Sequence, residues 1–290
     1  MTDQALRVIS GWTDPRTRRC RLAGELKGRR MQEREVVSYG VEGGIAMLEL
    51  RRPDCLNAMN PALLGQLLAA LERAERDEAA GAVMLTGQGR AFSAGADIGY
   101  LSRASAAEVR ELARLAVAVT GRIETLGKPV LAAIHGDALG GGLEIAEACM
   151  LRLAAPQARF GHPEVKIGAV AGFGGTTRLP RLIGKGRAAE MLLTGRLIDA
   201  EEACRLGLVN RVVAADRLIA ESEALLREIM AQSPLAVRLS WEAIHRGLSM
   251  SEDESARLGA DYFGLVAQSE DFRIGTQAFL DKRQPEFKGR

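Results

Sequence analysis

The hydrophobic and polar positions along the chain predict a mixed α/β protein. From Glu35 onward, the run "VVSYGVEGGIAMLELRRPD" predicts two short strands that meet at a Gly43-Gly44 turn. The run "NPALLGQLLAALERAERD" has the spacing of an amphipathic helix, with Asn60 as its N-cap and Pro61 in the first helical position.

Further along, apolar runs alternate with helical patterns. The segments "AGAVMLTG" and "KPVLAAIHG" predict buried strands, "RLAAPQARFGHP" predicts further short strands, and "GRAAEMLLTG" predicts a helix. Strands that alternate with helices at this spacing are typical of βαβ units, so we expect a mostly parallel sheet.

Beyond about residue 215 the strand signals cease. The runs "DRLIAESEALLREIMAQSP", "LAVRLSWEAIHRGL" and "ESARLGADYFGLVAQ" predict successive helices, with Ser233-Pro234 as a break. Helices this apolar are expected to pack on the core or on another subunit. We therefore divide the chain into an N-terminal extension (1–34), a core (35–230) and a C-terminal helical region (231–290).

The N-terminal extension is rich in arginine and poor in apolar periodicity. Its stretch "GWTDPRTRRCRLAGELKGRR" is expected to be a disordered arm. Two other interpretations stay open: a segment upstream of a true start at Met31, or an organellar presequence. The acidic residues Asp3, Asp14 and Glu25 count against the presequence.

Composition and charge exclude several classes of protein. Hydrophobic residues make up 47% and charged residues 26% of the chain, which is typical of a globular protein. The net charge of +2 gives no general attraction to nucleic acid or to membranes. No apolar run approaches the roughly 20 residues of a membrane span, and no secretory signal is present, so a cytoplasmic location is expected. Four scattered cysteines without CxxC, and only three histidines, argue against a zinc site.

The most unusual local pattern is the glycine triplet in "DALGGGLEIAEA". Gly140–Gly142 follow a predicted strand and open a predicted helix, whose first N–H groups lack intrahelical partners and carry partial positive charge. Without side chains, they let an anion, or an oxygen that becomes one, approach closely. Close packing of the helix on a strand explains the glycines equally well. The turn 94–97 in "AFSAGAD" offers a second donor, or is simply a tight turn.

Two glutamates accompany these turns. Glu144 belongs to the first turn of the predicted helix, and Glu164 in "FGHPEVKIG" stands between Pro163 and an apolar stretch. Two carboxyl groups near one oxyanion site suit general acid–base catalysis, because their proximity separates their pKa values. Taken singly, Glu144 is also explained as a helix-start charge and Glu164 as a surface charge. For His162, a structural role is favoured.

Other catalytic motifs are missing. The sequence has no GxSxG frame, which makes a serine hydrolase unexpected. It also lacks GxxxxGK[ST] and GxGxxG, so nucleotide-binding loops are not supported.

Taken in order, the motifs resemble the crotonase superfamily, the enoyl-CoA hydratase/isomerase family. The matching segments cover about Glu35 to Lys288 with the spacing of that family: "RPDCLNAMN", "VMLTGQGRAFSAGADI", "KPVLAAIHGDALGGGLEIAEAC", "ARFGHPEVKIGAVAGFGGTTRLPRLIG", "LLTGRLIDAEEACRLGLVNRVV" and "GTQAFLDKRQPEF". The resemblance implies a spiral of ββα units with a C-terminal helical trimerisation region, assembled as a homotrimer or as a hexamer of two trimers. It also implies an acyl-CoA thioester substrate, with no metal and no cofactor beyond the coenzyme A of the substrate.

The resemblance also assigns roles to residues. The thioester oxygen would lie between the N–H groups of Ala96 and Gly141. Glu144 would act as general base at the β-carbon, and Glu164 would give a proton to the α-carbon. Lys282 and Arg283 match a basic pair that approaches the CoA phosphates in the family. Together with these two, the residues expected along the substrate are Cys55, Ala96, Asp97, Ile98, Gly99 and Gly140.

Some positions depart from the family pattern. Asp137 stands where the family often has a tyrosine, and Met150 where an aspartate is frequent. Ala171 replaces a usual proline, with Phe173 beside it near the expected acyl pocket, so the preferred chain length stays open.

The expected function is that of an enoyl-CoA hydratase, which adds water reversibly and syn across a trans-2-enoyl-CoA to give a 3-hydroxyacyl-CoA. The presence of both glutamates favours this reaction over two alternatives in the same family, an enoyl-CoA isomerase and a CoA-ester hydrolase. A less favoured alternative is an RNA-binding relative that uses the basic N-terminal arm. The near-neutral charge of the remainder makes nucleic acid an unexpected partner.

Overall fold

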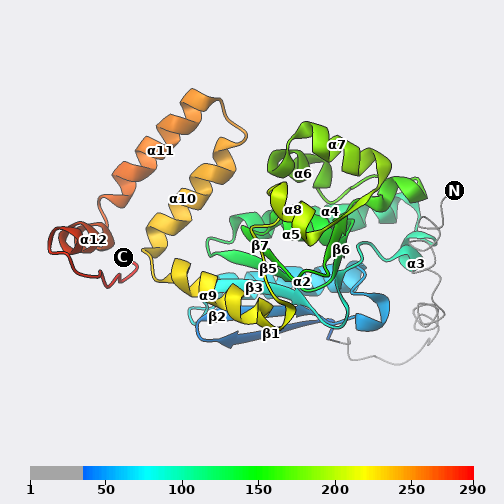
Figure 1. Ribbon diagram of the computed structural model, residues 1–290, viewed down its shortest axis with the longest axis horizontal. Coiled ribbons are helices and arrows are strands. Elements are labelled where there is room, and N and C mark those ends of the chain that lie inside the picture. Colours follow the sequence, from blue (N-terminus) through cyan, green and yellow to red (C-terminus); the bar gives the residue numbers. More distant parts are fainter. Residues whose placement is uncertain (1–34) are drawn as a thin grey trace.

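Two β-sheets form the centre of the protein, and helices cover them (Figure 1). The structure is a computed structural model that describes residues 35–290. The predicted disordered arm, residues 1–34, lies outside the described residues. None of the described helices is long and apolar enough to cross a membrane.

The larger sheet contains the predicted hairpin and the two predicted buried strands. Its strands β1 and β2 run antiparallel and meet at Gly43 and Gly44, which both have positive φ, so the predicted turn is confirmed. All other neighbours in the sheet are parallel. In spatial order the strands are β1 (Val37–Glu42), β2 (Ile45–Leu50), β3 (Ala82–Gly87), β5 (Val130–Ile134), β7 (Leu151–Ala154) and β10 (Arg211–Val212).

The smaller sheet is built from very short strands. In spatial order these are β4 (Ala91–Ser93), β6 (Asp137–Leu139), β8 (Arg159–Gly161) and β9 (Leu197–Asp199). The first three are parallel, and β9 runs antiparallel to β8.

The chain alternates between the sheets as it advances. It places β3, β5 and β7 in the larger sheet and follows each with β4, β6 or β8 in the smaller one. Each pair of strands is followed by helices that return the chain: α4 (Ala106–Thr125), α5 (Gly141–Ala148) and α6 (Gly175–Ile183). The expected crotonase-like spiral of ββα units is therefore confirmed.

Parallel strands in the larger sheet are buried on both faces, as such sheets require. On β3, Val83 and Leu85 belong to the main core, whereas Ala82 and Met84 face the cluster beneath α9 (Leu218–Met230). The predicted helix α2 (Pro61–Arg76) covers the main-core side, and Asn60 caps it by accepting a hydrogen bond from the Leu63 N–H.

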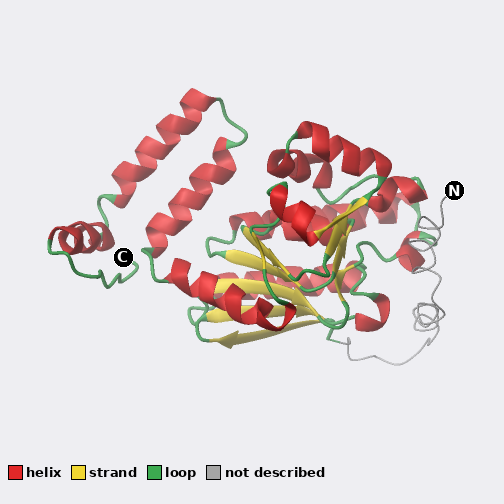
Figure 2. Ribbon diagram, in the orientation of Figure 1, coloured by secondary structure: helices red, strands yellow, loops and turns green. Residues whose placement is uncertain are grey.

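The last helices form an arm that projects from the sheets (Figures 1 and 2). The predicted domain boundary at residue 230 falls at the end of α9, and the predicted break at Ser233-Pro234 separates α9 from α10 (Pro234–Gly247). Trp241 on α10 connects the arm to α4 through a hydrogen bond from its indole N–H to the Glu124 carbonyl oxygen (2.9 Å).

The remaining elements are η2 (Pro53–Cys55), α3 (Ile98–Leu101), η3 (Pro163–Ile167), α7 (Lys185–Thr194), α8 (Ala200–Arg205), η4 (Ala215–Arg217), α11 (Glu252–Val266) and α12 (Glu270–Leu280).

A fully buried asparagine holds β4 in position. The Asn57 side-chain amide donates hydrogen bonds to the carbonyl oxygens of Gln88, Ala91 and Phe92, and its oxygen accepts one from the Arg52 N–H. The Asn57 carbonyl oxygen in turn accepts a hydrogen bond from the Ser93 hydroxyl (2.9 Å). One side chain thus satisfies the buried carbonyl groups of Ala91 and Phe92 at the start of β4, which would be costly unpaired.

Replacing Asn57 by alanine is expected to lower the free energy of unfolding by about 2–4 kcal/mol, because it leaves buried carbonyl groups without donors. The matched control is Asn60→Ala, which removes only a helix N-cap and should cost about 1 kcal/mol. Urea denaturation at one fixed protein concentration measures both losses. Equal losses for the two variants would contradict the special role given to Asn57.

Candidate active site

The predicted site residues lie at one edge of the smaller sheet. Strands β4, β6 and β8 are parallel, so their carboxyl ends meet at the same edge. Directly after them come three of the predicted groups: Ala96 after β4, Gly141 after β6, and Glu164 after β8. The carboxyl ends of parallel strands are a common place for ligands.

The turns after β4 and β6 are in contact. A Cβ atom built on Gly95 would lie 3.1 Å from the Gly141 nitrogen, and one built on Gly141 would lie 3.6 Å from the Ala96 nitrogen. The structure thus brings together the two residues predicted as oxyanion donors.

Both predicted donor N–H groups are available to a ligand. Met59 pairs with the residues on either side of Ala96: its N–H donates to the Gly95 carbonyl oxygen, and its own carbonyl oxygen accepts from the Asp97 N–H. The Ala96 N–H therefore points away from this pairing. Among residues 35–290, neither the Ala96 nor the Gly141 N–H donates to another residue. Two such groups side by side can stabilise negative charge on one oxygen.

Each glycine of the triplet faces a different neighbour. A Cβ atom on Gly140, which has φ +50°, would lie 2.6 Å from Glu164 Oε1. On Gly141 it would lie 2.6 Å from the Phe173 ring, and on Gly142 it would lie within 2.3 Å of the Ser93 carbonyl oxygen. Gly142 thus fits the packing interpretation, whereas Gly140 and Gly141 adjoin groups of the site.

Glu144 is buried inside the protein. Its Oε1 accepts hydrogen bonds of 2.7 Å from the backbone N–H groups of Phe173 and Gly175. Burial raises the pKa of Glu144 to about 7, although the Gly175 hydrogen bond and the nearby His162 oppose the rise. Glu144 lies in the first turn of α5, as both interpretations require, and its carboxylate in addition binds the backbone of another loop. A carboxyl group with this pKa can exchange protons near neutral pH.

Glu164 lies on η3 and points back toward the glycines. Its side chain is only 15% exposed, so it is not the solvated loop charge of the alternative interpretation. Oε1 adjoins Gly140, as described above, and Oε2 lies 3.8 Å from His162 Nδ1 with no hydrogen-bond partner among the described residues.

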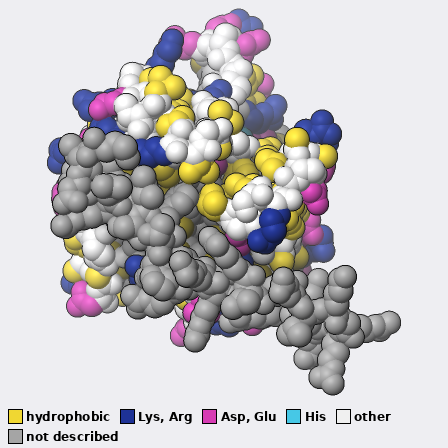
Figure 3. Space-filling model, turned by 90° about the vertical axis from the view of Figure 1, so that its right-hand side faces the viewer, with side chains coloured by type: hydrophobic (Ala, Val, Ile, Leu, Met, Phe, Trp, Pro, Cys, Tyr) yellow, Lys and Arg dark blue, Asp and Glu magenta, His cyan; other side chains and the backbone are white. Residues whose placement is uncertain are grey.

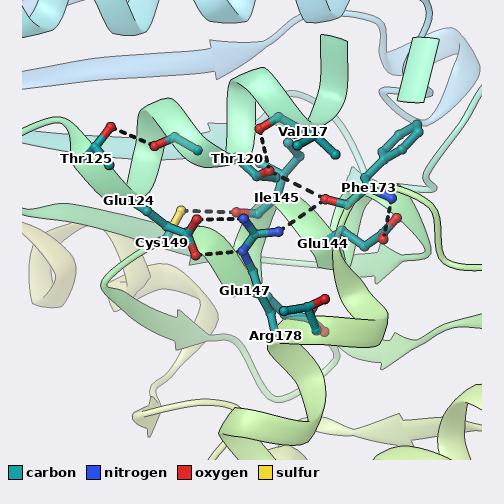
Figure 4. A network of polar contacts seen from close by, with 12 residues as sticks. Val117, Thr120, Glu124, Thr125, Glu144, Ile145, Glu147, Cys149, Phe173 and Arg178 are labelled. Carbon is teal, nitrogen blue, oxygen red and sulfur yellow. Dashed lines mark hydrogen bonds and ion pairs between the residues drawn. The ribbon is translucent and has the colours of Figure 1, made fainter. Parts of the chain in front are cut away.

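The loop that carries Phe173 is fixed by an ion pair that no sequence pattern predicts. Arg178 on α6 donates two hydrogen bonds to the Glu124 carboxylate (2.7 and 2.6 Å) and a third to the Phe173 carbonyl oxygen (3.2 Å), as Figure 4 shows. The Thr120 hydroxyl contacts the same carbonyl oxygen at 3.5 Å. These contacts hold the Phe173 N–H toward Glu144 and its ring against Gly141.

A second buried pair joins His162 to Glu147, and it is not among the predicted contacts. His162 Nε2 and Glu147 Oε1 are 2.8 Å apart, and both side chains are fully buried. Glu147 lies three residues after Glu144, which puts both on one face of α5. That spacing was the available signal.

Other predicted substrate residues lie around this edge. Cys55 ends η2, and Asp97 caps α3 while its carboxylate pairs with Arg52 at 3.0 Å. Ile98 and Gly99 form the first turn of α3. Figure 3 views the molecule from the side on which α3 lies in Figure 1, and hydrophobic side chains gather on that side among charges of both signs.

Lys282 and Arg283 are not brought to the site within one chain. They follow α12, which lies at the far end of the arm from α5 (Figure 1).

Asp137, at the start of β6, is paired with Arg159 (2.7 Å) rather than left as a free charge at the mouth of the site. Residues 35–290 contain no group of three or more His, Cys, Asp or Glu residues arranged to hold a metal ion.

Comparisons with known proteins agree with this geometry. A sequence model described as enoyl-CoA hydratase/isomerase matches residues 40–290. Crotonyl-CoA hydratase of Syntrophomonas wolfei is 42% identical over 85% of this chain and 95% of its own length. Short-chain-enoyl-CoA hydratase of Clostridium acetobutylicum is 41% identical over 86% and 96%. The crystal structure of enoyl-CoA hydratase from Bacillus anthracis matches with a TM-score of 0.85 and 36% identity, over 88% of this chain and all (100%) of that one. The chain therefore belongs to the enoyl-CoA hydratase/isomerase family.

The buried Glu144 should make stability depend on pH. Its pKa is about 7 in the folded protein against an ordinary 4.5. Between these values the folded state holds a proton that the unfolded state has lost, so this contribution to stability falls as pH rises. Glu144→Gln keeps an acceptor for both N–H groups but does not titrate. The variant should therefore gain stability relative to wild type on going from pH ~5 to pH ~8, by on the order of 3 kcal/mol.

Urea denaturation of both proteins at the two pH values measures this difference. A variant whose stability relative to wild type is the same at both values would show that Glu144 does not titrate in this range.

Proposed function

We propose that this protein hydrates short-chain trans-2-enoyl-CoA thioesters, with Glu144 and Glu164 as its catalytic residues. Its family and the hydratases at 42% and 41% identity make it an enzyme, a hydro-lyase of the enoyl-CoA hydratase type. The observation that carries the assignment of residues is the meeting of two available N–H groups with two glutamates at one sheet edge.

The N–H groups of Ala96 and Gly141 would bind the thioester oxygen. When water attacks the β-carbon, electrons move from the double bond to this oxygen and an enolate forms. Donors fixed in advance stabilise that charge without reorganisation, and losing one such donor typically costs about 10²–10³ in rate.

The two glutamates would divide the proton transfers. Glu144, in its ionised form, takes a proton from the attacking water, and Glu164, in its protonated form, gives a proton to the α-carbon. The water supplies the hydroxyl group, so one water molecule is consumed in total. A further proton exchange between the two carboxyl groups, through solvent, restores the starting state. The pKa of about 7 for Glu144 suits a base that works near neutral pH.

The remaining predicted contacts belong to the same proposal. Cys55 and the segment 97–99 would line the path of the pantetheine and acyl group, and the coenzyme A of the substrate is the only cofactor that this reaction requires. Lys282 and Arg283 would reach the CoA phosphates of a site on another copy of the chain, since they are remote from their own. A cytoplasmic location stays a prediction.

Assembly of three copies, or of two such trimers, is part of the proposal. The arm exposes large apolar side chains, among them Phe279 (83%), Leu280 (73%) and Phe263 (69%). Such surfaces mark sites of association.

Light scattering should give the mass of three or six chains at micromolar concentration, and Phe279→Ser should weaken the assembly. A stable monomer with full activity would contradict this assignment.

A short acyl chain is favoured by Phe173. Its ring lies against Gly141, where a Cβ atom would be 2.6 Å from a ring carbon, and so it fills space beside the proposed thioester position. Two of the relatives are named for crotonyl-CoA and short-chain substrates.

Phe173→Ala should raise kcat/KM for trans-2-octenoyl-CoA relative to crotonyl-CoA by about tenfold or more. An unchanged ratio would show that Phe173 does not limit the chain length.

Removing the acid should stop turnover but not binding. Glu164→Gln keeps the size of the side chain but cannot donate the proton, so kcat for crotonyl-CoA should fall by about 10³ or more. The affinity for a saturated acyl-CoA, measured by calorimetry, should stay within about tenfold. Glu190→Gln, on α7, is a matched control that should keep full activity. A Glu164→Gln enzyme with more than about a tenth of wild-type kcat would exclude Glu164 as the acid.

A further inference from the structure

We propose that His162 and Glu147 form a buried pair that positions Glu164, with the His162 ring as the link between the two carboxylates. Because it concerns the action of Glu164, this inference rests on the proposed function. It assigns work to a histidine for which the sequence favoured only a structural role.

The three side chains form a row across two elements. Glu147 on α5 contacts His162 Nε2 through Oε1 at 2.8 Å. On the opposite side of the ring, His162 Nδ1 faces Glu164 Oε2 at 3.8 Å. The His162 and Glu147 side chains are fully buried, so solvent does not screen the attraction between these two groups.

Unpaired atoms mark the gap in this row. His162 Nδ1 and Glu164 Oε2 are both buried, and neither has a hydrogen-bond partner among the described residues. Buried polar atoms without partners are costly, so a hydrogen bond between His162 Nδ1 and Glu164 Oε2 would stabilise the folded protein. A shift of Glu164 by about 1 Å brings these two atoms to hydrogen-bond distance.

The charges around His162 favour its protonated form. Burial alone lowers the pKa of His162, but the Glu147 carboxylate, joined by that of Glu164 whenever Glu164 is ionised, outweighs burial and raises that pKa to about 10. At neutral pH both ring nitrogens then carry hydrogen, so Nε2–H donates to Glu147 and Nδ1–H is directed at Glu164.

The other charged groups near the row are already engaged. Glu144 accepts its two backbone hydrogen bonds, and Arg178 is paired with Glu124. The buried Arg152 on β7 donates to the carbonyl oxygens of Leu208 and Cys149, among others. His162 is therefore the group that directly faces both Glu147 and Glu164.

The His162–Glu147 pair would act at the step in which Glu164 gives its proton to the α-carbon. When Glu164 gives its proton to the α-carbon, it becomes an anion close to Glu144 and Glu147. The His162 Nδ1–H can then donate to the new carboxylate, which stabilises it and fixes its orientation. No proton leaves His162, so the ring positions Glu164 and is not itself a catalytic residue.

Two substitutions of His162 separate the two sides of the ring. The amide nitrogen of glutamine occupies about the position of Nε2, whereas that of asparagine occupies about the position of Nδ1. His162→Gln should therefore lower kcat for crotonyl-CoA about 10- to 100-fold with KM nearly unchanged, the value expected for one charge-assisted hydrogen bond. His162→Asn should retain more of kcat than His162→Gln. The reverse order of the two variants would overturn the proposal.

The pH profile distinguishes positioning from simple structural support. Loss of a buried cation raises the pKa of neighbouring carboxyl groups. Both limbs of the kcat profile should thus move to higher pH in His162→Gln. In Glu147→Gln an anion is lost together with the proton of His162, so the two changes oppose each other and the profile should move less. An unchanged profile in His162→Gln, with lower thermal stability alone, would reduce the pair to a structural role. His245→Gln on α10, far from the site, is the matched control.

Nitrogen NMR of labelled histidine tests the pair without turnover, and the chain has only three histidines to assign. His162 should keep both ring N–H groups up to pH ~8 in the wild-type protein and lose one in Glu147→Gln. A His162 that titrates near its ordinary pKa would overturn the inference even in an active enzyme. A wild-type protein that fails to hydrate crotonyl-CoA would instead overturn the proposed function, and the NMR result would still decide whether the pair exists.

Discussion

The site depends on the close contact between the first turn of α5 and the turn that follows β4. At Gly142 the helix approaches the Ser93 carbonyl so closely that a Cβ atom would lie 2.3 Å from the oxygen. This contact sets the Gly141 N–H beside the Ala96 N–H, and Asn57 secures β4 from the other side. A side chain at Gly141 or Gly142 would push the N–H groups of Ala96 and Gly141 apart. The conformational cost of glycine, about 1 kcal/mol each, is offset by this proximity.

Burial of Glu144 follows from the same geometry. Because α5 starts inside the protein, its first-turn carboxyl group is buried, and the backbone of the 173–175 loop donates two hydrogen bonds to it. Arg178 and Glu124 hold that loop in place, so an ion pair outside the site controls both the Glu144 environment and the Phe173 ring. The environment of Glu144 and the position of the Phe173 ring are thus coupled through one short loop.

Much of this arrangement could be predicted from the sequence, and the limits are physical. The hairpin, the buried strands, α2 and the final helices follow from periodicity and caps such as Asn60. The strands β4 and β6 have only three residues each, too few for a period to be visible. The long helix α4 was not predicted, although Ser105 and Glu108 form a capping box at its start.

Pairs formed by folding were the other limit. Arg178 and Glu124 are 54 positions apart, and no local pattern predicts their pairing. Glu147 and His162 are 15 positions apart, and the spacing of Glu147 from Glu144 indicates a shared helix face but not this partner. The glutamates Glu144 and Glu164 were found because each stands beside a recognisable turn or proline. Their common location at one sheet edge became visible only in three dimensions, as did the distance of Lys282 and Arg283 from that edge.

We propose that one oxyanion site and two carboxyl groups add water across a conjugated thioester. NMR analysis of the product that the wild-type enzyme forms from crotonyl-CoA in D₂O tests this directly. The product should be 3-hydroxybutyryl-CoA with a single deuterium at the α-carbon, on the same face as the new hydroxyl group. Release of free CoA, or deuterium at the γ-carbon of an unhydrated product, would contradict it.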